Sequence, residues 1–155
     1  MSIKFIVEYR DKIPLGNPIY VGDEESFDFE PWLECDCSIM IGIGYNSLDV
    51  SLNSGVVSHL SGLNSKANWK TGIVEPPKAN LGVLKIRSSE NLIPGIGVTY
   101  ADDWVTTYDN KSGWIQIGNY RKTDKNQFVE FAKNTIAAIK NGELETIWIK
   151  PKMID

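Results

Sequence analysis

A tight turn near the end of the chain constrains the fold more than any other feature. Asn141-Gly142 separates two apolar segments, residues 135–139 and 144–149, and Asn-Gly in that setting is the strongest short-range signal for a two-residue β-hairpin. The facing residues are then Lys140 with Glu143, Ile139 with Leu144, and Ile136 with Ile147. One opposite-charge pair and two apolar pairs stabilise antiparallel strands. The sequence therefore predicts a C-terminal hairpin that closes the core.

The segment 125–139 also fits a helix. Five apolar residues follow helical spacing, and Asp124 is a suitable cap for the start. These apolar residues are Phe128, Phe131, Ala132, Ile136 and Ile139. We favour the hairpin. The alternative is an α+β fold with one helix around 125–139 packed on the sheet.

The rest of the chain has short strand-like segments separated by turn signals. They are rich in β-branched and aromatic residues, as strands require. The segments are 3–9, 19–21, 38–45, 48–53, 56–61, 82–87, 98–100, 104–108 and 114–117. A chain of 155 residues with this pattern is expected to be one mainly β domain, spanning residues 1–155. We expect either an antiparallel sandwich or a curled sheet.

Three of these segments lie close together in sequence and predict an antiparallel meander. Residues 38–45 form a nearly continuous apolar run, which indicates a strand buried on both faces. Residues 48–53 alternate apolar and polar, which indicates one solvent-exposed face. Residues 56–61 continue the pattern after a Ser-Gly turn. Upstream, residues 27–30 fit a half-exposed strand and an acidic loop equally well.

The charge is distributed unevenly along the chain. The net charge is −4, yet residues 13–65 contain no Lys or Arg and eight acids, which gives this window −8. Nucleic acid is an unsuitable partner for such a segment, because phosphate binding needs a positive surface. A basic protein partner would suit it better.

No apolar run is long enough to span a bilayer, and the N-terminus has no signal-peptide pattern, so we expect no membrane partner and a cytoplasmic location.

Few residues suggest catalysis or metal binding. His59 is the only histidine, and the adjacent Ser58 should point to the opposite face of the strand, so the two should not form a nucleophile–base pair. Cys35 and Cys37 lie too close in sequence for an unstrained disulfide, and with one histidine they cannot supply the usual four zinc ligands. We expect reduced, structural thiols, no catalytic residue, no cofactor and no metal. The chain is predicted not to be an enzyme.

Five tryptophans are many for this length. Trp114 and Trp148 lie in apolar strands and are expected in the core. Trp32 lies inside the acidic window, and Trp104 directly follows Asp102-Asp103. Aromatic side chains beside acids are typical of protein-binding surfaces, so Trp32 and Trp104 are predicted to lie at an interface.

The C-terminal segment FVEFAKNTIAAIKNGELETIWIKP, residues 128–151, resembles a recurring pattern in small bacterial immunity proteins of contact-dependent inhibition and related polymorphic toxin systems. The resemblance implies that the chain neutralises a toxin, and it assigns no functional residue. Many toxins of these systems are nucleases with basic clefts, which an acidic surface would complement. The predicted docking residues are Asp23, Glu24, Glu25, Asp28, Glu30, Trp32, Asp102, Asp103 and Trp104. The alternative is a small enzyme or ligand-binding β module that has a Trp-lined pocket and uses His59.

Overall fold

The computed structural model describes residues 3–42, 46–121, 123 and 125–155. Within these residues there is no α-helix, and one short 3-10 turn, η1, covers Lys66–Asn68. The strands are β1 (Ile3–Tyr9), β2 (Asn17–Val21), β3 (Ser26–Glu30), β4 (Cys37–Met40), β5 (Ser47–Ser51), β6 (Val56–Leu63), β7 (Lys70–Thr71), β8 (Asn80–Ser88), β9 (Val98–Thr99), β10 (Thr106–Tyr108), β11 (Ile115–Gly118), β12 (Asn126–Ala132), β13 (Thr135–Lys140), β14 (Glu143–Ile149) and β15 (Lys152–Ile154).

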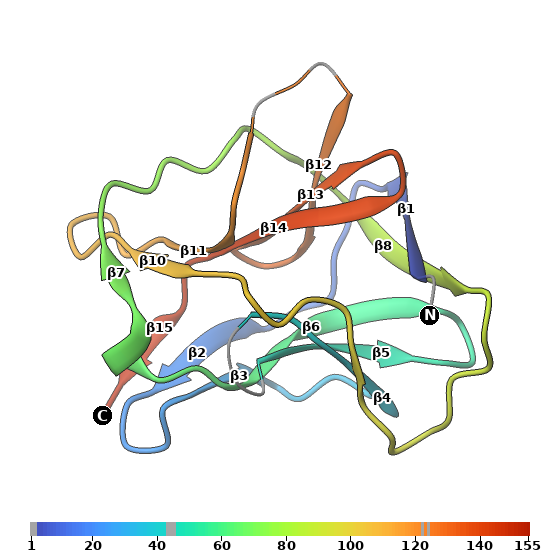
Figure 1. The fold of residues 1–155 in the computed structure, drawn as a ribbon, viewed down its shortest axis with the longest axis horizontal. Coiled ribbons are helices and arrows are strands. Elements are labelled where there is room, and N and C mark those ends of the chain that lie inside the picture. Colours follow the sequence, from blue (N-terminus) through green and yellow to red (C-terminus); the bar gives the residue numbers. More distant parts are fainter. Residues whose placement is uncertain (1–2, 43–45, 122, 124) are drawn as a thin grey trace.

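The strands form one strongly curled, open sheet, a half-barrel (Figure 1). Its main path runs β15-β2-β3-β6-β8-β12-β13-β14-β11-β10-β7, and β1, β4, β5 and β9 branch from it. The prediction of a mainly β fold with a curled sheet is confirmed. The helix alternative for 125–139 is wrong, because this segment forms β12 and most of β13, which pair with each other. The proposed cap, Asp124, lies outside the described residues.

The C-terminal hairpin of β13 and β14 is confirmed. Lys140 faces Glu143 and Ile139 faces Leu144, as predicted. The third predicted pair is wrong, because Ile136 faces Trp148. The register shifts beyond Ile139, and Glu145 is left without an opposite residue. Such a β-bulge adds one residue to one strand and moves every later pair by one position.

The meander of β4, β5 and β6 is also confirmed, but the predicted burial of two strands is not. β4 alternates buried and half-buried residues instead of being buried on both faces, and residues 43–45 of the predicted strand lie outside the described residues. β5 has no solvent-exposed face, because its polar residues Ser47 and Asp49 are buried. Residues 27–30 belong to a strand, β3, with Phe27 and Phe29 buried.

Most of the apolar core forms one cluster that joins strands distant in the sequence. This large cluster joins β1, β3, β4, β5, β6, β8 and the C-terminal strands. A second, smaller cluster surrounds Trp148, which is fully buried as predicted, and Trp114 packs against this cluster while half-buried. No helix in the described part of the chain is long and apolar enough to cross a membrane.

Candidate functional site

One face of the β4–β5–β6 meander is mostly polar, although Met40 and Val56 also lie on it, and its polar residues are nevertheless buried or half-buried. We call it the polar face; its polar residues are Ser38, Ser47, Asp49, Ser58, His59 and Ser61. The opposite face carries Ile39, Leu48, Val50, Val57 and Leu60, which belong to the apolar core. The alternation read from the sequence is therefore real, but the polar side does not meet solvent. Burying polar groups costs free energy unless they are paired, so this face needs an explanation.

A β-bulge in β6 brings Ser58 and His59 to the same face. Asp49 faces His59 and Val50 faces Val57, so Ser58 is an extra residue between two consecutive pairs. At a bulge, two neighbouring side chains point to the same side. The Ser58 Oγ lies 2.9 Å from the His59 Nδ1. The prediction that these two side chains point to opposite faces is therefore wrong, because it assumed an unbroken strand.

The Asp49 carboxylate lies at the centre of the polar face. Its Oδ1 accepts hydrogen bonds from Ser38 (3.1 Å) and Ser47 (3.2 Å), and its Oδ2 accepts one from Ser61 (2.5 Å). Hydroxyl donors on a carboxylate make charge-assisted bonds that offset the cost of its burial. Three serines from three strands thus hold Asp49 in one orientation.

The imidazole of His59 is fully buried and is only partly satisfied. Its Nε2 lies 3.2 Å from the Asp49 Oδ2, which is an ion-pair distance, but the two are not oriented for a hydrogen bond, and Nε2 has no partner among the described residues. The Ser58 hydroxyl donates to the Asp49 backbone carbonyl at 3.0 Å. Because that bond uses the only hydroxyl proton of Ser58, the Nδ1–H must donate to the Ser58 Oγ. In the neutral ring this leaves Nε2 as a bare lone pair.

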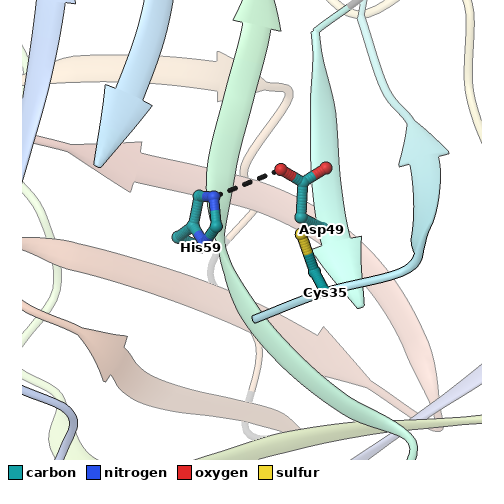
Figure 2. A group of neighbouring side chains, drawn as sticks. All are labelled: Cys35, Asp49 and His59. Atoms are coloured by element: carbon teal, nitrogen blue, oxygen red, sulfur yellow. Dashed lines mark ion pairs between the residues drawn. The ribbon is translucent and has the colours of Figure 1, made fainter. Parts of the chain in front are cut away.

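The loop of residues 31–36 covers the polar face. The edge of the Trp32 indole packs on the His59 ring with centroids 4.4 Å apart. The Cys35 thiol approaches the pair of Asp49 and His59, and the ligand atoms of these three residues all lie within 4.8 Å of one another (Figure 2). Burial, and then the charges of Asp49 and Asp36, raise the pKa of the Cys35 thiol to about 11. The thiol is thus protonated at neutral pH, which makes it a poor nucleophile.

Two cavities meet at Cys35. One, of about 400 Å³, is lined by Trp32, Cys35, Asp49 and Ser61 among others. The other, of about 520 Å³, lies on the side of Ser58 and also has an apolar wall that includes Phe131. The covering loop therefore separates two hollows, and the polar face lines both.

The predicted docking residues fall into separate places. Asp23, Glu24 and Glu25 are exposed at the turn between β2 and β3, and Asp28 is half-buried on β3. Glu30, the last residue of that strand, and Trp32, just beyond it, are exposed. Trp32 is the member that reaches the polar face.

Asp102, Asp103 and Trp104 lie apart from this group. Residues 95–101 run along β4, with the Gly95 N–H donating to the Asp36 carbonyl and the Tyr100 N–H to the Met40 carbonyl. Asp36 and residue 102 therefore lie near opposite ends of β4, roughly 15 Å apart at about 3.3 Å per residue. Trp104 is half-buried and packs edge-on against Tyr100.

Sequence reasoning missed Cys35, Asp49, Ser58 and Ser61 as members of one site. The sequence signal that could have found them is a group of polar residues on neighbouring strands of the predicted meander, close to a loop that contains Trp32 and Cys35.

Among known proteins, a scan against protein-family models found no match, and neither did a search of curated proteins.

Proposed function

We propose that this protein is a toxin-neutralising immunity protein that binds a basic toxin domain through the acidic surface around Trp32. The observation that supports the proposal best is the exposure of Trp32, 55% of whose surface is accessible. Glu30, Glu34 and Asp36, all exposed, lie in the same short segment. A large exposed aromatic surrounded by charge is the usual composition of a binding hot spot and its polar rim.

The acids and the tryptophan have different roles in this proposal. Exposed carboxylates attract a basic partner over several ångströms and raise the association rate, an effect that salt weakens. Trp32 supplies contact area at the centre and slows dissociation. Glu30 is expected to contribute less than Glu34, because Lys150 and Lys152 line the same cavity as Glu30 and reduce the local negative potential.

The proposal predicts that a toxin domain is encoded beside this protein's gene, and it is tested by measuring binding to that domain. We expect Glu30→Lys with Glu34→Lys to lower the association rate about tenfold and to weaken its salt dependence. Trp32→Ala should raise the dissociation rate about tenfold or more. The matched control is Glu75→Lys, an exposed acid outside the acidic window. If the two charge reversals change binding no more than this control, the docking surface lies elsewhere.

A second candidate function is hydrolysis. It rests on the Ser58 Oγ lying 2.9 Å from the His59 Nδ1, with Ser58 lining the larger cavity. In this role the Ser58 hydroxyl would have to turn from the Asp49 carbonyl and donate to His59, so that the imidazole acts as its base.

Ester hydrolysis distinguishes the two candidates. If the chain is a hydrolase, Ser58→Ala should abolish cleavage of an activated ester such as p-nitrophenyl acetate, whereas Ser61→Ala should retain it. If the chain is an immunity protein, both variants should bind the toxin domain as the natural chain does, and neither should change the background rate.

A further inference from the structure

We infer that Cys35, Asp49 and His59 form a binding site for a zinc ion. The three side chains come from three separate segments: the covering loop, β5 and β6. Their ligand atoms lie within 4.8 Å of one another (Figure 2), and His59 and Asp49 are buried, with 0% and 3% of their surface exposed. The inference goes beyond the proposed function and can be tested without any partner protein.

The unpartnered nitrogen of His59 is the observation that points to a cation. The hydrogen bonds of Ser58 leave the Nε2 lone pair free of a proton in the neutral ring, and this lone pair lies 3.2 Å from a carboxylate oxygen. Two acceptors held that close in a buried site repel each other unless a positive charge lies between them. Because Nε2 has no hydrogen-bond partner in the described part of the chain, a metal ion satisfies both groups where the present geometry does not.

The spacing of the donors suits tetrahedral zinc. Zinc lies at about 2.0–2.2 Å from nitrogen and oxygen ligands, so two such ligands in a tetrahedron are separated by about 3.3 Å. The observed separation of Nε2 and Oδ2 is 3.2 Å. A zinc-bound sulfur would lie about 3.6 Å from either atom, so Cys35 needs to move by on the order of 1 Å at most. Cys35 lies in a loop and not in a strand, which allows such a movement.

The donor types and their neighbours favour zinc. One thiolate, one imidazole and one carboxylate form a mixed set that zinc accepts and that hard ions such as Mg²⁺ do not. Metal-binding histidines usually have the second ring nitrogen held by a hydrogen bond, and carboxylate ligands are held in the same way. Here Ser58 holds His59, and three serines hold Asp49. On binding, the Cys35 S–H bond breaks, its sulfur binds zinc, and the proton passes to solvent.

The fourth position of the zinc would open into the cavity of about 400 Å³ beneath Trp32, since Cys35 and Asp49 both line it. A water molecule would complete the tetrahedron there. Bound zinc would also tie the loop of residues 31–36, and with it Trp32, to β5 and β6.

Titration of the chelator-treated protein with zinc alone tests the site. We expect one zinc ion per chain, and with Co²⁺ in its place a thiolate-to-metal charge-transfer absorption. Cys35→Ser should weaken zinc binding at least about 100-fold, the upper end of the loss caused by removing a residue that only hydrogen-bonds to a metal ligand. Cys37→Ser is the matched control, because its thiol donates to the Ile96 carbonyl outside the site, and it should leave the affinity within twofold.

Nitrogen NMR of the imidazole gives a second readout on the unaltered chain. Because His59 is the only histidine, its two ring nitrogens need no assignment against other residues. We expect zinc to shift Nε2 while Nδ1 keeps its proton. Absence of zinc binding at micromolar concentration, equal losses in Cys35→Ser and Cys37→Ser, or an Nε2 signal that zinc does not shift would each overturn the inference. None of these outcomes depends on toxin binding.

Discussion

The C-terminal hairpin and the β4–β5–β6 meander are both buried parts of the same sheet, yet they bury opposite kinds of side chain. In β13, four apolar residues follow Thr135 without interruption and all are buried. In the meander, one face buries a carboxylate, an imidazole and several hydroxyls. Apolar burial stabilises a fold, whereas buried polar networks rarely stabilise it more than apolar residues of similar size. The hairpin is therefore the scaffold, and the polar face is the region whose composition stability alone does not explain.

The largest effect is expected from removing the central side chain of the hairpin. Trp148→Ala deletes a fully buried indole and its hydrogen bond to the Gln116 side chain. We expect a loss of about 3–5 kcal/mol in the free energy of unfolding, measured by urea denaturation. Ile73→Ala is the control, because Ile73 is 84% exposed and should change stability by less than about 0.5 kcal/mol. A loss below about 1 kcal/mol for Trp148→Ala would contradict the assignment of the hairpin as scaffold.

A double substitution on the polar face would test the other half of the comparison. Asp49→Ala removes the acceptor of three serines and the partner of His59, and should cost about 2–3 kcal/mol. Replacing both residues, Asp49→Val with His59→Leu, should cost less than the single change, because no buried imidazole is left without its carboxylate, while the three serines lose their acceptor in both variants. Urea denaturation in the presence of a chelator measures both without a metal contribution. If the double variant is less stable than the single one, the polar face does stabilise the fold.

A single added methyl group should cost less stability beside the polar face than beside the hairpin. Gly118 in β11 has a φ of 110°, and a Cβ there would lie 2.6 Å from the Glu145 carbonyl oxygen. Gly118→Ala should therefore cost about 1–3 kcal/mol. Gly97→Ala, at the cavity beneath Trp32, would meet its nearest atom at an ordinary 3.5 Å and should be nearly neutral. Equal costs in thermal or urea unfolding would mean that the site is packed as tightly as the scaffold.

The smallest effect concerns the turn between β10 and β11. Hydrogen bonds from the backbone N–H of Val74, and then of Lys111, lower the pKa of Asp109 to about 2. A lowered pKa means that Asp109 stabilises the fold above its ordinary pKa of about 4 and that this contribution is lost as pH falls toward 2. The urea midpoints of Asp109→Ala and the natural chain should therefore converge between pH 4 and pH 2. Asn110→Ala, which removes no titrating group, should show a constant offset.

Local patterns predicted the fold well but not the register. Asn141-Gly142 correctly predicted the turn, because positive φ at both positions is required there and observed, 52° and 79°. The pairing beyond Ile139 was missed because nothing in the sequence marks Glu145 as an extra residue. Strand positions were found from composition. The burial of the polar residues of β5 was missed because residues 31–36 cover them. This is a tertiary contact, and the alternation of apolar and polar residues gives no sign of it.

The candidate site was harder to predict than the fold. His59 and Trp32 were singled out separately, for two different functions, and the structure places their rings in contact. Cys35 lies close to Asp49 and His59 because its loop folds back over two strands. The spacing of these residues along the sequence does not predict this contact. The acidic docking residues remain a prediction.

The extra residue at Ser58 makes the site depend on the number of residues in β6 as well as on their identity. Val57 and Leu60 are three positions apart, so in a regular strand they would point to opposite faces of the sheet. Both nevertheless face the apolar core. Deleting Ser58 would restore strict alternation, with Val57 and Leu60 still facing the core and His59 still on the polar face, and would remove only the hydroxyl that holds His59. Deletion of Ser58 should therefore be tolerated better than deletion of Leu60, which would turn Ser61 toward the apolar core. Ser58 joins His59 on the polar face only because the alternation of side chains in β6 shifts by one residue at the bulge.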